Sequence, residues 1–342
     1  MKIAFYSSKR YDRESFNRVN QERGNAQALE LIFFEERLSA MTAPLARGCD
    51  GVCIFVNDQA DAAAIGSLAD MGIKVMALRC AGFNQVDLAA AETHKLTVVR
   101  VPAYSPYAVA EHTLALALTL NRNTHRAYNR VRENNFMLDG LQGFDMHGRT
   151  VGIVGTGKIG QCTARAFAGL GCHILADDLM PNHTLEEEGL LRYVDFATIL
   201  EECDIISLHC PLTPETHHLI DDEAIACMKP GVMLLNTSRG KIIDTRAVIA
   251  GLKSGQIGHL GLDVYEEEEG LFFEDRSAHI PHDDIFSRLL TFPNVLITGH
   301  QAFLTADALH NIATTTLENL EQVLSGKACP NHVKVNPGAA SK

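Results

Sequence analysis

Short apolar runs alternate with longer stretches of helical spacing along the first hundred residues. The apolar runs are continuous, rich in Val and Ile, and cover residues 2–6, 51–56, 73–78 and 96–101. Stretches with apolar side chains at helical spacing lie between them, over residues 61–71 and 86–94. Continuous apolar strands separated by helices are typical of a parallel sheet that helices cover on both faces. The pattern therefore predicts an α/β domain in this part of the chain.

A second alternating region begins near residue 149. Six strand-like runs cover residues 150–154, 172–176, 205–208, 232–235, 260–264 and 295–298, with helical stretches between most of them. Six strands are the number expected for a complete dinucleotide-binding sheet. Residues 266–290 are acidic and have no clean period, which predicts a long loop with short helices.

One long helical pattern, residues 105–132, separates the two regions. Its middle is apolar on nearly every side, which predicts a helix buried between domains or between subunits. Another helix is expected over residues 306–325, and we expect the short tail behind it to pack back onto the first domain. The predicted organisation is a discontinuous domain of residues 1–102 and 301–342, with residues 103–300 inserted as a second domain.

Composition excludes several classes of protein. The 342 residues carry a formal net charge of −12, which argues against a large surface for nucleic-acid phosphates or an anionic membrane. No apolar run is long enough to span a bilayer, and the N-terminus lacks the apolar core of a signal peptide, so we expect a cytoplasmic protein. The nine cysteines form no C-x-x-C pair, which favours reduced thiols over disulfides and predicts no metal site.

The strongest local signal is the loop Gly155-Thr-Gly157-Lys-Ile-Gly160, which follows an apolar strand and opens a helical stretch. In this context the first glycine permits a tight turn, the second lets the backbone approach a pyrophosphate, and the third lets helix and strand pack closely. Asp177 and Asp178 follow at the end of the next strand, where an acid binds the ribose 2′-hydroxyl of NAD and repels the 2′-phosphate of NADP. The cofactor expected is NAD. We expect Asp178 to contact the ribose, with Asp177 as the alternative.

Three polar side chains lie where predicted strands end, which is where parallel α/β sheets place their ligands. Arg239 and His300 each follow a strand, and Asp263 ends one. A hydride-transfer enzyme that acts on a keto acid needs a cation for the carboxylate, an acid for the carbonyl oxygen and a group that tunes this acid. These residues are therefore candidates for that chemistry.

Motifs in these same segments resemble the D-isomer-specific 2-hydroxyacid dehydrogenase family. They occur in family order over nearly the whole chain: RCAGFN from residue 79, VPAYSP from 101, GTGKIG from 155, LHCPLT from 208, NTSRG from 236, GLDVYE from 261 and GHQAFLT from 299. Within the family, LFFED from residue 271 and CPN from 329 resemble the bacterial fermentative D-lactate dehydrogenases. The resemblance implies two doubly wound parallel-sheet domains, a flavodoxin-like substrate domain and a Rossmann NAD domain, with the active site in the cleft between them.

The resemblance also implies roles for individual residues in the NADH-dependent, reversible reduction of pyruvate to D-lactate. Arg239 corresponds to the arginine that grips the substrate carboxylate and polarises the ketone, and His300 to the acid/base. Glu268 corresponds to the carboxylate that hydrogen-bonds this histidine and favours its charged form. Because residues 266–269 are all glutamate, a register shifted by one residue is the alternative.

Further matches concern the cofactor and the substrate pocket. Asp263 corresponds to a residue near the nicotinamide carboxamide, and Lys158 and Ile159 to the loop that touches the pyrophosphate. The backbone of Cys80, Ala81 and Gly82 is implied to hold the substrate carboxylate. Tyr104 and Phe303 resemble walls of a small pocket at the pyruvate methyl, with ordinary interdomain packing as the alternative. The positions implied to line the cofactor are Cys210, Pro211, Thr237 and Ser238.

Two other readings of the sequence lead to different functions. The first keeps the chemistry and changes the substrate to another small 2-keto acid, such as a branched or phenyl analogue or glyoxylate. The second is an NADH-binding transcriptional corepressor of the same fold, for which we would expect extra tails. The apolar helix and the family together predict a homodimer through the cofactor domain, or a homotetramer.

Overall fold

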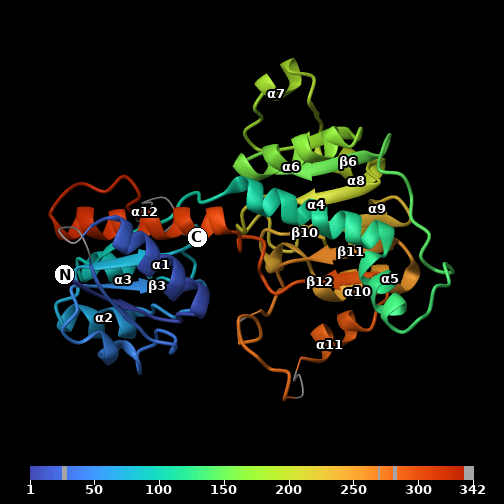
Figure 1. The fold of residues 1–342 in the computed structure, drawn as a ribbon. Helices are drawn as coiled ribbons and strands as arrows, with labels where there is room; N and C mark the ends of the chain where they lie inside the picture. Colours follow the sequence, from blue (N-terminus) through green and yellow to red (C-terminus); the bar gives the residue numbers. More distant parts are fainter. Residues whose placement is uncertain (25–28, 269, 280–282, 335–342) are drawn as a thin grey trace. The chain divides into compact units, whose positions relative to one another are not determined.

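The computed structural model describes residues 1–24, 29–268, 270–279 and 283–334 (Figure 1). Backbone contacts divide the chain into one unit of Met1–Ser105 and Leu304–Lys342 and a second unit of Pro106–Phe303. Each unit is built around its own parallel sheet. Two parallel-sheet α/β domains were predicted from the sequence, and this fold class is confirmed.

The sheet of the first unit has five parallel strands in the order β2-β1-β3-β4-β5. This 2-1-3-4-5 order is that of the flavodoxin-like doubly wound fold. The four apolar runs predicted in this region each contain one strand, and the edge strand β2 was missed because its side chains are only partly buried. The strands are β1 (Lys2–Phe5), β2 (Glu30–Phe33), β3 (Gly51–Ile54), β4 (Val75–Leu78) and β5 (Thr97–Arg100).

Helices cover this sheet and bring the C-terminal segment into the unit. Helix α12 packs against β4 and β5. It also packs against α1, as the red and dark-blue ribbons of Figure 1 show. Helix α1 escaped prediction because half of its buried positions, Asp12 and Ser15, are polar. The helices are α1 (Arg10–Glu22), the 3₁₀ helix Ala43–Ala46, α2 (Ala62–Asp70), α3 (Leu88–Thr93) and α12 (Ala306–Leu324).

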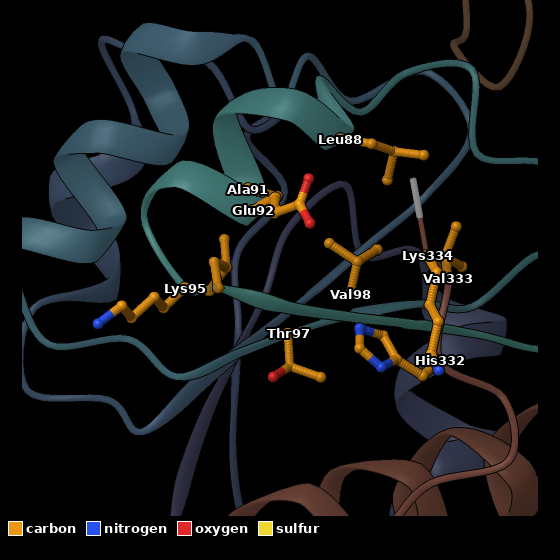
Figure 2. Close-up of a pocket in the computed structure, with 10 residues that line it drawn as sticks. Leu88, Ala91, Glu92, Lys95, Thr97, Val98, His332, Val333 and Lys334 are labelled. Atoms are coloured by element: carbon orange, nitrogen blue, oxygen red, sulfur yellow. The ribbon is translucent and has the colours of Figure 1, made fainter. Parts of the chain in front are cut away.

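The chain after α12 runs antiparallel along the outer edge of β5. His332 pairs with Val99, and the Val333 N–H donates to the Val98 carbonyl at 2.8 Å. A surface pocket of about 480 Å³ lies between this segment, α3 and the start of β5 (Figure 2). Glu92 and Lys95 line it together with His332. None of the residues that line this pocket was a candidate site residue.

The sheet of the second unit has seven parallel strands in the order β12-β11-β10-β9-β6-β7-β8. Counted from β6, the order is 7-6-5-4-1-2-3, which is the Rossmann order with one strand added at the far edge. The six predicted runs correspond to six of these strands, and the seventh, β8, has only two residues and leaves no pattern in the sequence. The strands are β6 (Thr150–Val154), β7 (His173–Asp177), β8 (Arg192–Tyr193), β9 (Ile205–Leu208), β10 (Val232–Asn236), β11 (Ile257–Leu262) and β12 (Val295–Ile297).

Two apolar clusters cover opposite faces of this sheet. Successive strand residues such as Ile205 and Ile206 belong to different clusters, as the alternation of side chains along a strand requires. Helices α4 and α6 pack side by side on one face, and α8, α9, α10 and α11 cover the other (Figure 1). The helices are α4 (Pro106–Arg122), α5 (Thr124–Arg132), α6 (Lys158–Gly169), α7 (Thr184–Glu187), α8 (Phe196–Glu202), α9 (Asp222–Cys227), the 3₁₀ helix Gly240–Ile242, α10 (Thr245–Ser254) and α11 (Asp284–Leu290).

The prediction of one helix over residues 105–132 was wrong, because the structure has two helices there. Asn123 adopts a left-handed conformation with φ 50° and ends the first helix, a conformation that Asn tolerates better than most residues. Helix α4 is buried against β10 and β11, whereas α5 has no buried residue. In the part of the chain that the structure describes, no helix is both long enough and apolar enough to cross a membrane.

Candidate active site

The glycine-rich loop joins β6 to α6 and leaves an open cradle at the start of the helix. A Cβ on Gly155 would lie 2.7 Å from the Cys210 nitrogen, and one on Gly160 would lie 2.0 Å from the Gly155 oxygen. A Cβ on Gly157 would meet nothing within 4 Å, and Gly157 is the N-cap of α6. The first and third glycines are therefore required by packing, and the second leaves room for a phosphate at the helix N-terminus. Lys158 and Ile159 form the first turn there, and the loop fits a dinucleotide.

Asp178 lies directly beside this loop. Its Oδ2 accepts the Thr156 N–H at 2.5 Å and the Thr156 hydroxyl at 2.9 Å. Burial and the neighbouring Asp178 raise the pKa of Asp177, which ends β7. Sequence reasoning missed the partner Tyr193, whose hydroxyl lies 2.8 Å from the Thr156 hydroxyl; its signal is weak because Tyr193 belongs to the two-residue strand β8.

The loops after β9 and β10 continue the same edge of the sheet. Cys210 and Pro211 follow β9, and Cys210 is next to the tight turn at Gly155. Burial raises the pKa of the Cys210 thiol to about 11, so the thiol is neutral at physiological pH. Thr237 and Ser238 follow β10, and the Thr237 hydroxyl lies 2.9 Å from the hydroxyl of Thr113 on α4.

His300 and Glu268 form a hydrogen-bonded pair. The histidine Nδ1 donates to the Glu268 Oε1 at 2.9 Å, and the two side chains are 18% and 20% exposed. The other carboxylate oxygen of Glu268 accepts the Tyr265 N–H at 3.2 Å. Among the described members of the glutamate run, Glu268 is the residue that contacts His300, as the register from the sequence predicted. Because Nδ1 is engaged, Nε2 is the ring nitrogen left to exchange a proton with a ligand.

Asp263 holds the turn that carries His300. Its carboxylate is fully buried and accepts the Thr298 hydroxyl at 2.5 Å and the backbone N–H groups of Gln301 and Ala302 at 2.9 and 2.8 Å. Burial alone would raise the pKa of Asp263, but these hydrogen bonds and the nearby His112 lower it below its usual range.

The family resemblance implies a position for Asp263 beside the nicotinamide, and this stays a prediction. The observed bonds of its carboxylate go to the turn around His300. Its partners Thr298 and His112 were missed. His112 lies on α4, one of 15 histidines in the chain, and nothing in its local sequence marks it as a partner of Asp263.

Arg239 is available to bind an anion. It follows β10, and its Nη1 donates to the Ser238 carbonyl at 2.7 Å. Its guanidinium forms no ion pair with any carboxylate of the described residues. The buried Asn236 holds the turn, because its side chain donates to the Arg239 carbonyl and accepts from Ser238. A half-buried guanidinium without an acidic partner suits a carboxylate ligand.

In the first unit, the segment after β4 is arranged as a set of backbone donors. The carbonyls of Cys80, Ala81 and Gly82 accept from Val101, Arg100 and the Cys80 thiol, respectively. Over the described ranges, the N–H groups of Ala81 and Gly82 have no hydrogen-bond partner. Carbonyls turned into the protein and free N–H groups form the concave donor arrangement that binds anions.

The structure thus distributes the predicted residues over both units. Arg239, Asp263, Glu268 and His300 follow the carboxyl ends of the adjacent strands β10, β11 and β12 in the second unit. Phe303 is buried in this unit as well. Cys80, Ala81, Gly82 and the half-buried Tyr104 belong to the first unit. The expected cleft between the domains stays a prediction.

Comparisons with known proteins agree with this geometry. A family model described as D-isomer specific 2-hydroxyacid dehydrogenase, NAD binding domain, matches residues 114–302. The D-lactate dehydrogenase of Escherichia coli (strain K12) is 52% identical over 97% of this chain and 100% of its own length.

Solved structures give the same result. The apo structure of D-lactate dehydrogenase from Escherichia coli has a TM-score of 0.89 at 50% identity and covers 97% of this chain and 100% of its own. The pyruvate reductase of Chlamydomonas reinhardtii has a TM-score of 0.90 at 46% identity, with 97% and 98% covered. The D-lactate dehydrogenase of Lactobacillus jensenii, solved with NAD⁺, has a TM-score of 0.82 at 34% identity, with 98% and 100% covered. The chain therefore belongs to the D-isomer-specific 2-hydroxyacid dehydrogenase family, and its second unit contains the NAD-binding domain of that family.

Proposed function

We propose that the protein reduces pyruvate to D-lactate with NADH, reversibly. The observation that carries the proposal is the His300–Glu268 pair at 2.9 Å. It lies on the same sheet edge as Arg239, which has no acidic partner among the described residues. The names of the relatives support the choice of substrate, because they include D-lactate dehydrogenases and a pyruvate reductase.

Each residue has a distinct task in this reaction. Arg239 and the N–H groups of Ala81 and Gly82 bind the substrate carboxylate, and Arg239 also polarises the ketone. The glycine-rich loop and Asp178 would hold NADH, which would supply the hydride. The Nε2 of His300 donates a proton to the ketone oxygen, and the Glu268 carboxylate stabilises the imidazolium before this transfer. In lactate oxidation the same nitrogen accepts the hydroxyl proton.

Each domain has its own part in this proposal. Residues 1–102 and 301–342 form the substrate domain, and residues 103–300 form the NAD domain. Tyr104 and Phe303 form the walls beside the substrate methyl. Since one methylene in an apolar pocket is worth only about 1–3 kcal/mol, other small 2-keto acids are the second candidate substrates.

A panel of keto acids tests the substrate assignment. We expect kcat/KM with NADH to be highest for pyruvate, lower for branched and phenyl analogues and for glyoxylate, and the product to be D-lactate. Chiral resolution of the product measures the second point. A clear preference for a bulkier keto acid would make that acid the substrate in place of pyruvate. Formation of L-lactate as the product would contradict the reaction expected of this family.

We also propose that the protein is a homodimer formed through its cofactor domain. Exposed apolar side chains gather on α5 and the segment after it: Tyr128, Val131, Phe136, Met137 and Leu138. Several large apolar side chains exposed along one short segment are typical of a protein interface. For the wild type, sedimentation velocity is expected to show a dimer, or a tetramer built from it. The variant Leu138→Asp is expected to contain more monomer than the wild type. A monomeric wild type at micromolar concentration would exclude the proposal.

A further inference from the structure

The two loops that carry Arg239 and Glu268 touch along their backbones. Gly240 directly follows Arg239, and a Cβ on Gly240 would lie 2.0 Å from the Tyr265 oxygen and 2.4 Å from the Glu266 nitrogen. No other residue type fits there without moving one of the loops. The relative position of Arg239 and Glu268 is therefore set by what holds these two loops together.

Glu266 lies on one side of this contact, and its carboxylate bonds to the other side and to a third loop. Its Oε2 accepts the hydroxyl of Thr245 at 2.8 Å and the Thr245 N–H at 3.2 Å, and Thr245 begins α10 directly after the Arg239 loop. Its Oε1 lies 2.8 Å from Nε2 of His218. Burial would raise the pKa of Glu266, but the hydrogen bonds from Thr245 and His218 lower it, so the group is a carboxylate at neutral pH.

His218 brings in a third loop, the one after β9 that also carries Cys210. Its backbone N–H donates to the Lys241 carbonyl at 2.9 Å, two residues beyond Arg239. It adopts a left-handed conformation with φ 52°, which costs a non-glycine residue on the order of 1–3 kcal/mol and persists only where the surroundings impose it. Its ring stacks on that of His217, with the centroids 4.0 Å apart.

From these contacts we propose that His218, Glu266 and Thr245 form a positioning bridge that fixes Arg239 relative to the Glu268–His300 pair. The inference rests on the proposed function, in which Arg239 and His300 act on neighbouring atoms of one small substrate. These three residues touch neither substrate nor cofactor in this role. A displacement of about 1 Å between reacting groups can cost on the order of 100-fold in rate, so the bridge controls turnover from outside the reacting groups.

The glutamate run supplies a matched pair of variants. Glu266→Ala removes the bridge, whereas Glu267→Ala removes a neighbouring carboxylate whose side chain is 68% exposed and lies 4.0 Å from Lys241. Glu266→Gln keeps hydrogen-bonding atoms at both ends. We expect Glu266→Ala to lower kcat/KM on the order of 10- to 100-fold, Glu266→Gln to recover most of the loss, and Glu267→Ala to match the wild type.

The histidines supply a second pair. We expect His218→Ala to lower kcat/KM as Glu266→Ala does and His217→Ala to have little effect. Because the bridge acts as a unit, the double variant His218→Ala/Glu266→Ala is expected to lose no more than the more damaged single variant.

The decisive experiment measures four quantities for every variant: kcat/KM for the 2-keto acid that the wild type reduces fastest, Kd for NADH, Kd for oxamate in the presence of NADH, and Tm. Oxamate has the shape and charge of pyruvate. The bridge predicts a larger loss of oxamate binding and turnover than of NADH binding. The glycine-rich loop and Asp178 are not displaced, although Cys210 and Ser238 lie on the bridged loops. His218→Ala provides the test if Glu266→Ala does not fold.

The inference would be overturned if the variants lost NADH affinity and oxamate affinity to the same extent, in proportion to their fall in Tm. Equal activity of Glu266→Ala and Glu267→Ala would also overturn it. Failure of the proposed function looks different, because the wild type itself would then not reduce pyruvate. In that case the bridge variants are compared with the wild type on the keto acid that the wild type does reduce.

Discussion

His300 occupies an unusual backbone conformation for a histidine. Its φ of 53° lies in the left-handed region, and its N–H donates to the Asp263 carbonyl at 2.7 Å. The Asp263 carboxylate binds the next two N–H groups along the chain. The turn is therefore imposed by Asp263, which directs the His300 ring towards Glu268. Asp263 and His300 were predicted from their places after strands, and Glu268 was implied by the family resemblance. The bonds among them could not be predicted, since these depend on which strands become neighbours.

Replacing Asp263 by Asn tests this account through its pH dependence. The folded-state pKa of Asp263 is lowered, so its carboxylate stabilises the fold at pH values above the unfolded pKa of about 4, and this contribution disappears as the pH falls through the lower, folded pKa. We expect Asp263→Asn to lower the free energy of unfolding by about 1–3 kcal/mol at pH 7. Denaturation measured from pH 7 down to pH 3 is expected to show the difference between variant and wild type shrinking with acidity. If the difference in the free energy of unfolding stayed constant with pH, it would contradict a stabilising role for the ionised Asp263 carboxylate.

Asp178 is expected to set the preference between NADH and NADPH. The anionic carboxylate repels a 2′-phosphate on the ribose, and Asp178→Asn removes this charge. We expect the ratio of kcat/KM for NADH to that for NADPH to fall on the order of tenfold, which corresponds to about 1.4 kcal/mol. Asp177→Asn is the matched control, because the carboxylate of Asp178, not of Asp177, bonds to the glycine-rich loop. A change in Asp177→Asn alone would assign the ribose contact to Asp177.

At the level of elements, the periodicity of the sequence predicted most strands. It missed the features that depend on packing or on the conformation of a single residue. The partly buried strand β2 and the two-residue strand β8 have too little apolar pattern to be visible. The division between α4 and α5 depends on the conformation of one residue, Asn123. The close approach of Gly240 to the loop after β11 has no counterpart in the local sequence, and the bridge around Glu266 was missed for the same reason.

A buried ion pair joins elements of the first unit just before the Cys80–Gly82 segment. Arg79 is 1% exposed, its Nε donates to Asp12 of α1 at 3.1 Å, and its Nη2 donates to the Ser7 carbonyl after β1 at 2.9 Å. Because Arg79→Met leaves Asp12 buried without its cation, we expect it to destabilise the protein by about 3–5 kcal/mol. Chemical denaturation measures this loss, and the double variant Arg79→Met/Asp12→Asn is expected to recover part of it. If Arg79→Met had the same denaturation midpoint as the wild type, the ion pair would not stabilise the packing of these elements.

For the whole molecule, the acidic net charge of −12 contrasts with an anionic substrate. The proposed binding of pyruvate rests on local donors, Arg239 and the N–H groups of Ala81 and Gly82, rather than on the field of the protein. Some of the acidic residues make defined local hydrogen bonds, namely Asp178, Glu266 and Glu268. Sequence reasoning predicted both sheets and the residues at their edges.

The most direct test of the central claim is single-turnover oxidation of NADH by pyruvate with wild type and His300→Ala. If His300 is the acid, we expect the wild-type rate to fall by about 10²- to 10⁴-fold in the variant, while NADH binding, followed by fluorescence, is nearly unchanged. Near-normal turnover by His300→Ala would contradict the account and assign proton donation to another group.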